Sequence, residues 1–208
     1  TVTLVINGKT YTGTASGGTY SIQVTDVLPD NTYTASASVS DAAGNTGTNT
    51  GSVLVDTTGP ALTVNNLITN DNTPVITGTT DAANGSTVTL VINGHTYTGT
   101  ASGGTYSIQI TDALPDAVYT ASVSVADALG NITTKTGSVT VDTQAPAITV
   151  NNLSTNDNTP VITGTTDAAN GSTVTLVING KTYTGTASGG TYSIQVTDVL
   201  PDNTYTAS

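Results

Sequence analysis

Two aspartates stand in short proline-containing segments, each placed between runs of alternating apolar residues. The segment Asp56-Thr57-Thr58-Gly59-Pro60 returns 86 residues later as Asp142-Thr143-Gln144-Ala145-Pro146. Proline fixes φ and cannot donate a hydrogen bond to a β ladder, so each segment predicts a stiff joint between two β units. Carboxylate oxygens are the ligands that hard cations such as Ca²⁺ prefer. The joints are therefore candidate metal-binding segments.

Further carboxylates are expected to meet each joint. Because strand directions alternate in an antiparallel sandwich, its turns collect at two poles, and Asp56 at the end of one repeat should face Asp81 and Asp127 at the start of the next. Such carboxylates repel one another, and Ca²⁺ with six to eight oxygen ligands would turn that repulsion into attraction. The predicted metal ligands are Asp56, Asp81, Asp127, Asn131, Asp142 and Asp167, with Asp41, Asp71 and Asp157 as a second tier.

A simpler interpretation of the aspartates remains open. Aspartate is common in turns because its side chain mimics a backbone acceptor. This explains Asp30, Asp116 and Asp202, each of which lies in a Leu-Pro-Asp turn, but it explains less well why the joints carry Asp. The chain has neither EF-hand spacing nor a glycine-rich calcium nonapeptide, so the calcium hypothesis depends on predicted geometry.

Composition narrows the possible partners. Fourteen acidic and three basic residues give a net charge of −11, and all the acids are Asp. A chain this acidic is not expected to bind nucleic acid, and an anionic membrane surface would repel it. Without Cys there is no disulfide and no thiolate metal site. No apolar run is long enough to span a membrane, so we expect no direct membrane insertion of this segment.

The chain is built from a repeat. The run Thr1-Val2-Thr3-Leu4-Val5-Ile6-Asn7-Gly8 recurs from Thr87 and from Thr173, which fixes a period of 86 residues. We therefore expect three parts: residues 1–56 are the C-terminal part of a repeat without its first two strands, 57–142 are a complete repeat, and 143–208 are the N-terminal part of a repeat without its last two strands. Repeats in tandem with short joints predict a rod.

The complete repeat contains alternating runs separated by turn-forming residues. Asn93-Gly94 is a strong signal for a two-residue hairpin, and this turn places Ile92 opposite His95 and Leu90 opposite Tyr97. No stretch has helical periodicity. Seven short runs are expected as strands, at about 61–67, 75–80, 87–92, 95–100, 105–110, 119–125 and 137–141. The sequence thus predicts an all-β protein of tandem seven-stranded antiparallel sandwiches, immunoglobulin-like or fibronectin III-like.

Several motifs in combination resemble a known family. The joint at 142–146, the turn segment 155–164 and the loops at 167–172 and 127–131 are similar to the bacterial immunoglobulin-like repeats of giant surface adhesins. These are the biofilm-associated and RTX-type adhesins exported by type I secretion. The segment 114–119 also looks like the tyrosine corner of such sandwiches, so the hydroxyls of Tyr119, Tyr33 and Tyr205 should bond back to the backbone.

The resemblance implies an extracellular stalk on the bacterial cell surface. Such a stalk holds an adhesive tip away from the cell, is stiffened by calcium at the junctions between repeats, and supports cell adhesion and biofilm formation. The implied partners are the neighbouring repeats of the same chain and other adhesin chains in the biofilm matrix.

Two other classes of function are an enzyme and a repeat that itself binds a ligand. With one His, no Cys, no Glu and three Lys, no nucleophilic triad can recur from copy to copy, so an enzyme is not expected. Rows of exposed hydroxyls such as Thr96, Thr98 and Thr100 leave an alternative open, in which the repeat itself binds a polysaccharide or ice. Threonine is also simply a good residue for the solvent face of a strand.

Overall fold

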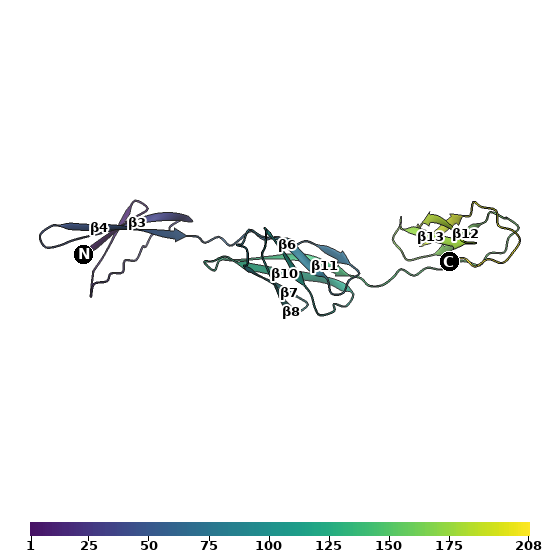
Figure 1. Cartoon of the computed structure of the whole chain (residues 1–208), viewed down its shortest axis with the longest axis horizontal. Coiled ribbons are helices and arrows are strands. Elements are labelled where there is room, and N and C mark those ends of the chain that lie inside the picture. Colours follow the sequence, from purple (N-terminus) through teal and green to yellow (C-terminus); the bar gives the residue numbers. More distant parts are fainter. The chain divides into compact units, whose positions relative to one another are not determined.

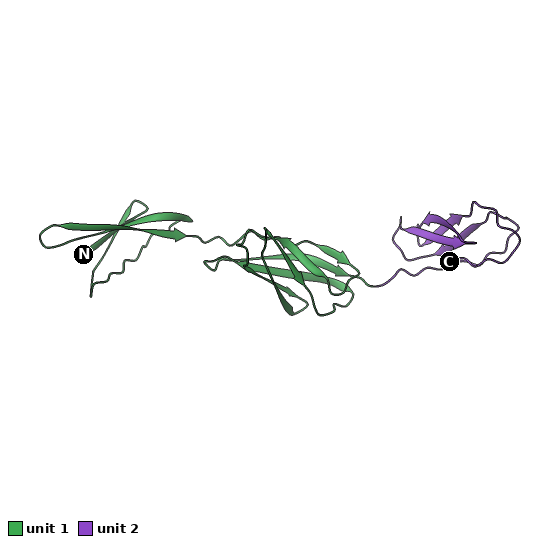
Figure 2. Ribbon diagram, in the orientation of Figure 1, with its two compact units in different colours: residues 1–143 green, residues 144–208 purple.

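The structure, a computed structural model, describes residues 1–208 and consists of strands and loops. It divides into two compact units, Thr1–Thr143 and Gln144–Ser208 (Figure 2). No helix in it could cross a membrane. The all-β class expected from the sequence is confirmed. The repeat boundaries at 56 and 142 stay predictions from the sequence period.

Residues 57–142 form a sandwich of two sheets around one core (Figure 1). The larger sheet has the strand order β5-β11-β10-β7-β8, and the smaller one pairs β6 with β9. The strands are β5 (Leu67–Thr69), β6 (Val75–Thr79), β7 (Thr87–Ile92), β8 (His95–Thr100), β9 (Thr105–Gln109), β10 (Ala117–Ala126) and β11 (Ile132–Val141).

Alternation of apolar and polar residues determines which face of each strand is buried. The β7–β8 hairpin pairs Ile92 with His95 and Leu90 with Tyr97, as the two-residue Asn93-Gly94 turn predicts. Asn93 adopts the positive φ that this turn requires. Fifteen buried residues make up the core: Leu62, Ile76, Val88, Leu90, Ile92, Ala101, Tyr106, Ile108, Ile110, Leu114, Ala121, Val123, Val125, Val139 and Val141.

The first segment of the repeat differs from the prediction of one strand over 61–67. The Thr63 amide donates to Thr79 O at 2.9 Å and the Asn65 amide to Thr77 O at 3.0 Å, so this part runs antiparallel to β6. The chain then crosses to the other sheet, where β5 pairs in parallel with β11. The prediction of purely antiparallel pairing was therefore wrong for this strand. By changing sheets, one segment supplies backbone partners to an edge of each.

Glycine is required where the first segment passes over β6. A Cβ on Gly78 would lie 2.1 Å from Thr63 O and 2.4 Å from the Tyr106 hydroxyl oxygen. The Tyr106 hydroxyl donates to Thr63 O at 2.7 Å across this close approach. Burial raises the pKa of Tyr106 to about 12. The absent side chain at Gly78 thus makes room for a buried tyrosine that joins two segments of the sandwich.

Residues 1–56 form one sheet with the order β2-β1-β3-β4. Its strands are β1 (Val2–Ile6), β2 (Lys9–Gly13), β3 (Asn31–Ser40) and β4 (Thr46–Val55). The β3–β4 ladder runs from Asn31 opposite Val55 to Ser40 opposite Thr46. This ladder ends directly before the first joint.

The second unit repeats the hairpin and the small sheet of the complete repeat. Its strands are β12 (Val161–Thr165), β13 (Thr173–Ile178), β14 (Lys181–Thr186) and β15 (Thr191–Gln195). β12 pairs with β15, and β13 pairs with β14. The amide of Thr149 donates to Thr165 O at 2.9 Å, as that of Thr63 donates to Thr79 O in the complete repeat. Eight buried residues, among them Leu176 and Tyr192, form a separate core.

The three predicted tyrosine corners are confirmed. The hydroxyl of Tyr119 donates to Pro115 O at 2.7 Å. Tyr33 makes the same bond to Pro29 O at 2.7 Å, and Tyr205 to Pro201 O at 2.8 Å. Each corner fixes the entry of the chain into a strand or strand-like segment and places an aspartate immediately after the accepting proline.

Candidate metal centre

The first joint, residues 56–60, lies beside the two loops that were predicted to face it, those containing Asp81 and Asp127. Asp56, Asp81 and Asp127 line one hollow. Pro60 lines the same hollow and is buried. Gly59 lies against the start of β11, where an added Cβ would come within 2.6 Å of Thr133 Oγ1. The alternation of strand direction therefore brings the end of one repeat and two loops of the next to the same place.

Asp127 shapes its own loop. One of its carboxylate oxygens accepts hydrogen bonds from the amides of Leu129 at 2.8 Å and Asn131 at 2.9 Å. The other accepts from Asn131 Nδ2 at 2.8 Å. These hydrogen bonds, with that from the Asn131 side chain the strongest, lower the pKa of Asp127. The group is therefore an ionised acceptor at neutral pH, in a loop closed by Gly130, whose φ is positive.

Asp81 and Asp56 each use one carboxylate oxygen for backbone contacts. Asp81 Oδ1 accepts from the Ala61 amide at 2.6 Å, which ties the loop after β6 to the end of the joint. Asp56 Oδ1 accepts from the Thr58 amide at 3.0 Å. The second oxygen of each carboxylate accepts no hydrogen bond from the protein. Two carboxylate oxygens beside the joint are thus available to a cation.

Asn131 connects the loop to the joint directly. Its Nδ2 donates both to Asp56 O at 2.9 Å and to Asp127 Oδ2 at 2.8 Å. The amide nitrogen thus performs a positioning role that the sequence did not predict. Of the two polar atoms in the Asn131 side chain, only the oxygen Oδ1 has the chemistry of a metal ligand.

The oxygen atoms around the hollow are of the type that binds Ca²⁺, but the carboxylates do not lie close together. All the candidate donors are oxygens, and three carboxylates give the charge that a divalent cation needs. No group of three or more acidic or histidine side chains lies close enough to hold a metal ion as placed. A bound cation would require the free oxygens of Asp56 and Asp81 to turn toward it. The identity of the ligands stays a prediction.

The other predicted ligands are spread over the chain. Asp142 belongs to the first unit and Asp167 to the second, so the second joint stays a prediction of the sequence. Asp167 Oδ1 accepts from the Ala147 amide at 2.7 Å, as Asp81 accepts from Ala61.

The second-tier aspartates hold local turns. Asp41 closes its own loop through Ala43 and Asn45, as Asp127 does. Asp71 and Asp157 accept from the amides of Thr73 and Thr159, two residues further along.

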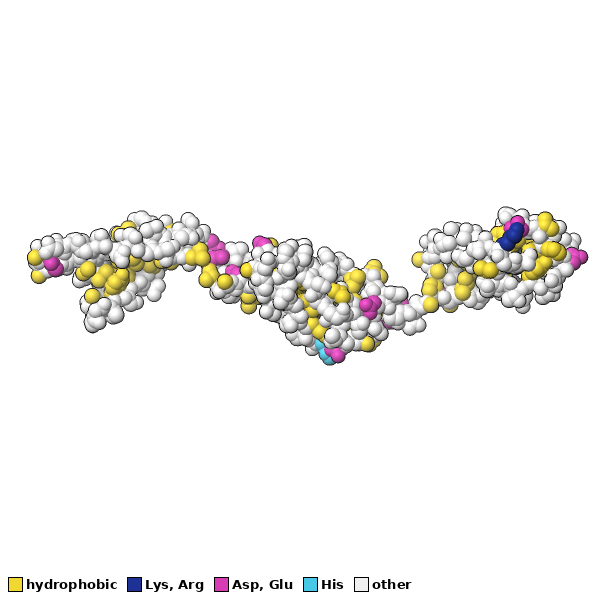
Figure 3. All heavy atoms as spheres, viewed as in Figure 1, with side chains coloured by type: hydrophobic (Ala, Val, Ile, Leu, Met, Phe, Trp, Pro, Cys, Tyr) yellow, Lys and Arg dark blue, Asp and Glu magenta, His cyan; other side chains and the backbone are white.

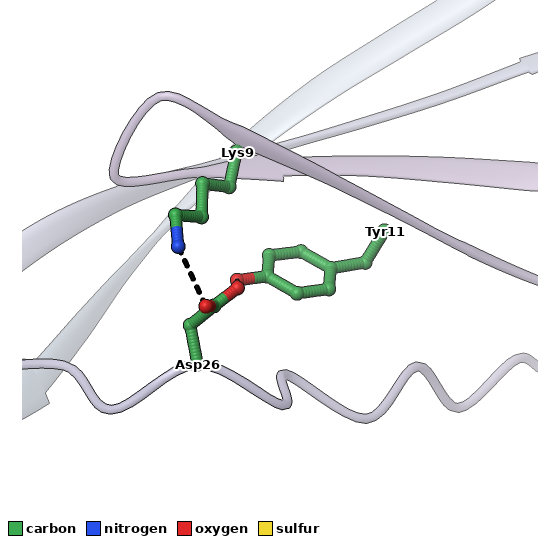
Figure 4. Close-up of polar contacts among 3 residues, drawn as sticks. All are labelled: Lys9, Tyr11 and Asp26. Carbon is green, nitrogen blue, oxygen red and sulfur yellow. Dashed lines mark hydrogen bonds and ion pairs between the residues drawn. The ribbon is translucent and has the colours of Figure 1, made fainter.

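A lysine–aspartate ion pair in two of the three hairpins was not predicted. Lys9 Nζ lies 2.5 Å from Asp26 Oδ1, and the hydroxyl of Tyr11 donates to Asp26 Oδ2 at 2.6 Å (Figure 4). Hydrogen bonds from Lys9 and then Tyr11 lower the pKa of Asp26. The group ties the start of β2 to the segment that follows. The separation of 17 residues between lysine and aspartate, constant from copy to copy, was the signal available in the sequence.

The same cluster recurs with one substitution. Lys181, Tyr183 and Asp198 repeat it in the second unit, with Nζ 2.5 Å from Asp198 Oδ1. In the complete repeat His95 replaces the lysine, and its Nδ1 lies 3.5 Å from Asp112 Oδ2. Figure 3 shows this histidine beside an acidic side chain. On the face shown there, the acidic residues form separate small groups rather than one continuous patch.

The fold and the aspartate-containing joint define a class of protein, a chain of immunoglobulin-like β-sandwich repeats. The model of the Bacterial Ig-like domain matches residues 1–57 and 61–143, and the chain belongs to this family. The family is one of non-catalytic repeats, which confirms the expectation that the chain is not an enzyme. No curated protein sequence matches the chain.

Three solved structures that match are described as adhesins or adhesion proteins. One, "Ca2+-stabilized adhesin helps an Antarctic bacterium reach out and bind ice", is 38% identical with a TM-score of 0.40, and the match covers 94% of this chain and 56% of that one. A second, a "1.5-MDa bacterial ice-binding adhesin" studied for host cell surface retention, is 32% identical with a TM-score of 0.44 and coverages of 94% and 74%.

The third is a tetra-tandem repeat in the extending region of a large adhesion protein. It is 28% identical with a TM-score of 0.38, and the match covers 95% of this chain and 58% of that one. The chain thus spans little more than half the length of the first and third structures.

Proposed function

We propose that these repeats form part of the stalk of an extracellular bacterial adhesin, and that Ca²⁺ at the joints stiffens it. The observation that carries this proposal is the hollow at the first joint, which Asp56, Asp81 and Asp127 line together. The described adhesins that match in sequence, one of them Ca²⁺-stabilized and one with tandem repeats in an extending region, agree with it. The role is mechanical: the repeats set the distance of an adhesive tip from the cell.

Calcium would act by linking three segments that are otherwise joined by few hydrogen bonds. Asp56 belongs to the joint, Asp81 to the loop after β6 and Asp127 to the loop after β10. A cation bound to oxygens from all three would hold the direction of the joint relative to the following sandwich, and Asn131 and backbone carbonyls could complete its shell. Surface location, participation in biofilm and export by type I secretion belong to the same proposal.

Calcium binding to the complete 208-residue chain tests the proposal. Titration calorimetry should detect binding at or below millimolar Ca²⁺, and small-angle scattering should show a larger maximum dimension with Ca²⁺ than with chelator. Replacing both Asp81 and Asp127 by Asn should remove the effect at the first joint. Asp112→Asn is the matched control, because Asp112 bonds to Tyr97 and does not line the hollow. A chain that binds no Ca²⁺ at millimolar concentration would rule out the calcium part.

A second function is favoured by one observation. The outer face of the large sheet carries a row of hydroxyls across four strands, since Thr98 pairs with Thr89, Thr89 with Ser124 and Ser124 with Thr134. Such a row could contact a polysaccharide or ice. A stalk repeat should show no retention on glycan arrays or in ice-affinity partition, whereas a ligand-binding repeat should be retained in one of them.

A further inference from the structure

The Leu28-Pro29-Asp30 turn precedes β3 and lies beside the end of β4, where the first joint begins. Its aspartate accepts hydrogen bonds from the joint. Asp30 Oδ1 accepts hydrogen bonds from the Thr57 amide at 3.0 Å and from the Thr57 hydroxyl at 2.7 Å. Asp30 Oδ2 accepts from the Thr58 hydroxyl at 2.7 Å. Both oxygens of one carboxylate are thus engaged by two consecutive residues of the joint. The simpler interpretation of Asp30 as a turn residue omits these three contacts.

The tyrosine corner sets the position of this carboxylate. The Tyr33 hydroxyl donates to Pro29 O, which fixes the backbone one residue before Asp30. In the β3–β4 ladder Asn31 lies opposite Val55, so Asp30 is level with Asp56 as the chain leaves the strand. The carboxylate therefore meets the first residues of the joint without any rearrangement of the sheet.

The arrangement recurs at the end of the complete repeat. Asp116 Oδ1 accepts from the Thr143 amide at 3.0 Å and from the Thr143 hydroxyl at 2.9 Å. Tyr119 makes the corresponding corner bond to Pro115 O. Two copies of the same contact indicate that the turn and the threonine after the joint aspartate act together.

Charge strengthens these hydrogen bonds. A carboxylate acceptor makes shorter and stronger hydrogen bonds than a neutral one. In agreement with the geometry, hydrogen bonds from Thr58 and then Thr57 lower the pKa of Asp30. The acceptor is therefore ionised throughout the neutral range, and no cation is needed to form the contact.

We propose that the aspartates of the first two Leu-Pro-Asp turns, Asp30 and Asp116, anchor the following joint to the preceding repeat independently of metal. Asp30 is a positioning residue: it directs Thr57 and Thr58, and thereby the side from which Asp56 reaches the next repeat. The purpose of the anchor rests on the proposed stalk function, but the anchor itself operates in chelator. The joint would then be held on one side by the turn and on the other by the loops of the following sandwich.

Amide hydrogen exchange on the complete chain in chelator tests the anchor. Thr57 is exposed, and its amide donates to Asp30 Oδ1, so this hydrogen bond is expected to slow exchange of the amide hydrogen. Asp30→Ala should accelerate exchange of the Thr57 amide at least about tenfold while leaving exchange in β10 and β11 unchanged. Asp202→Ala alters the same Leu-Pro-Asp turn in the second unit and should leave Thr57 exchange as in the parent chain. Unchanged Thr57 exchange in Asp30→Ala would overturn the proposal.

A second variant separates the anchor from the integrity of the turn. Replacing Thr57 and Thr58 by Val keeps the turn sequence and removes both hydroxyl donors. Backbone relaxation measurements should then show greater nanosecond mobility at residues 57–59 in chelator, and mobility equal to that of the parent chain would contradict the anchor. All these measurements are made without Ca²⁺, so they test the anchor alone. Failure of the calcium proposal would instead appear as the absence of a Ca²⁺ response in the parent chain. The two failures can therefore be distinguished.

Discussion

Residues 19–23 and 105–109 have the same five letters, Thr-Tyr-Ser-Ile-Gln, and different structures. In the complete repeat they form β9, which pairs along its whole length with β6. In residues 1–56 they form only an isolated bridge between Ser16 and Thr19. The tyrosine reports the difference most directly, because Tyr20 is 51% exposed and Tyr106 is 3% exposed.

The local path of the two segments is nevertheless similar. Ile22 lies against Gly13 as Ile108 lies against Gly99, with an added glycine Cβ at 2.7 and 2.8 Å from the isoleucine Cγ1. What residues 19–23 lack is a backbone partner on the other side. In the second unit, where β15 has β12 as its partner, the same letters form a strand again and Tyr192 is 4% exposed. A strand partner, rather than the sequence of the segment, decides whether the strand forms.

Among the substitutions considered, the largest effect on the pairing of β9 is expected from Ile76 in β6. This side chain is 1% exposed and pairs with Ile108, so Ile76→Ala should lower the free energy of unfolding of the complete repeat by about 2–5 kcal/mol. Residues 105–109 should then exchange their amide hydrogens more nearly as residues 19–23 do. Denaturant unfolding and hydrogen exchange measure the two effects.

Ile68→Ala is the control for that variant. Ile68 is 83% exposed, and its replacement should change stability by no more than about 0.5 kcal/mol. Equal destabilisation by both substitutions would mean that the small sheet does not hold β9 in place.

A smaller effect is expected from the tyrosine hydroxyl. Tyr106→Phe removes the hydrogen bond to Thr63 O and should cost about 1 kcal/mol. Burial raises the pKa of Tyr106 from 10.0 to about 12, so the neutral form is favoured in the folded chain. The stabilisation that the neutral Tyr106 side chain gives to the folded state is complete below pH 10 and is lost as the pH rises through 12.

Ultraviolet absorbance of tyrosinate measures this titration as a difference between the parent chain and the variant. The difference spectrum should titrate near pH 12. Tyr20→Phe, at the exposed counterpart, should leave stability unchanged at neutral pH. If both phenylalanine variants lowered stability equally, the contrast between the two segments would be lost.

The smallest effect is expected in the hairpin clusters, where Lys9 and His95 occupy equivalent positions. Lys9→His should raise the pKa of Asp26 toward its ordinary value, because the hydrogen bond from Lys9 is the main cause of the lowering. A lowered carboxyl pKa stabilises the fold above the ordinary value of 3.8, and this contribution is lost as the pH falls through the folded-state pKa. Carbon NMR titration of the Asp26 carboxyl follows the change.

Lys135→His provides the matched substitution away from the hairpin. Lys135 lies in β11, pairs with Val123 and forms no ion pair with an aspartate. It should leave the Asp26 titration unchanged. An unchanged Asp26 pKa in Lys9→His would show that Tyr11 alone holds the carboxylate.

The sequence predicted those features that depend on neighbouring residues. The Asn93-Gly94 turn requires positive φ and so sets the register of the β7–β8 hairpin, and the alternation in β10 shows which side chains are buried. Alternating strand direction also placed Asp56, Asp81 and Asp127 around one hollow, but their carboxylates do not form a group that could hold a metal ion, and the ligand set stays a prediction. The hydrogen bonds of Asn131 and Asp30 could not be predicted in this way, since they depend on side-chain rotamers at the ends of ladders.

The amino-acid sequence by itself determined the period, the strand type, the hairpin register and the acidic character of the joint, because each follows from local backbone preference or alternation. Only the tertiary structure decided that the first segment of the repeat changes sheets, that Thr-Tyr-Ser-Ile-Gln is a strand in two copies and not in the third, and that a turn aspartate holds the joint. The physical reason is that a backbone amide or carbonyl is satisfied by whichever partner lies beside it, and in a sandwich that partner comes from a distant part of the chain.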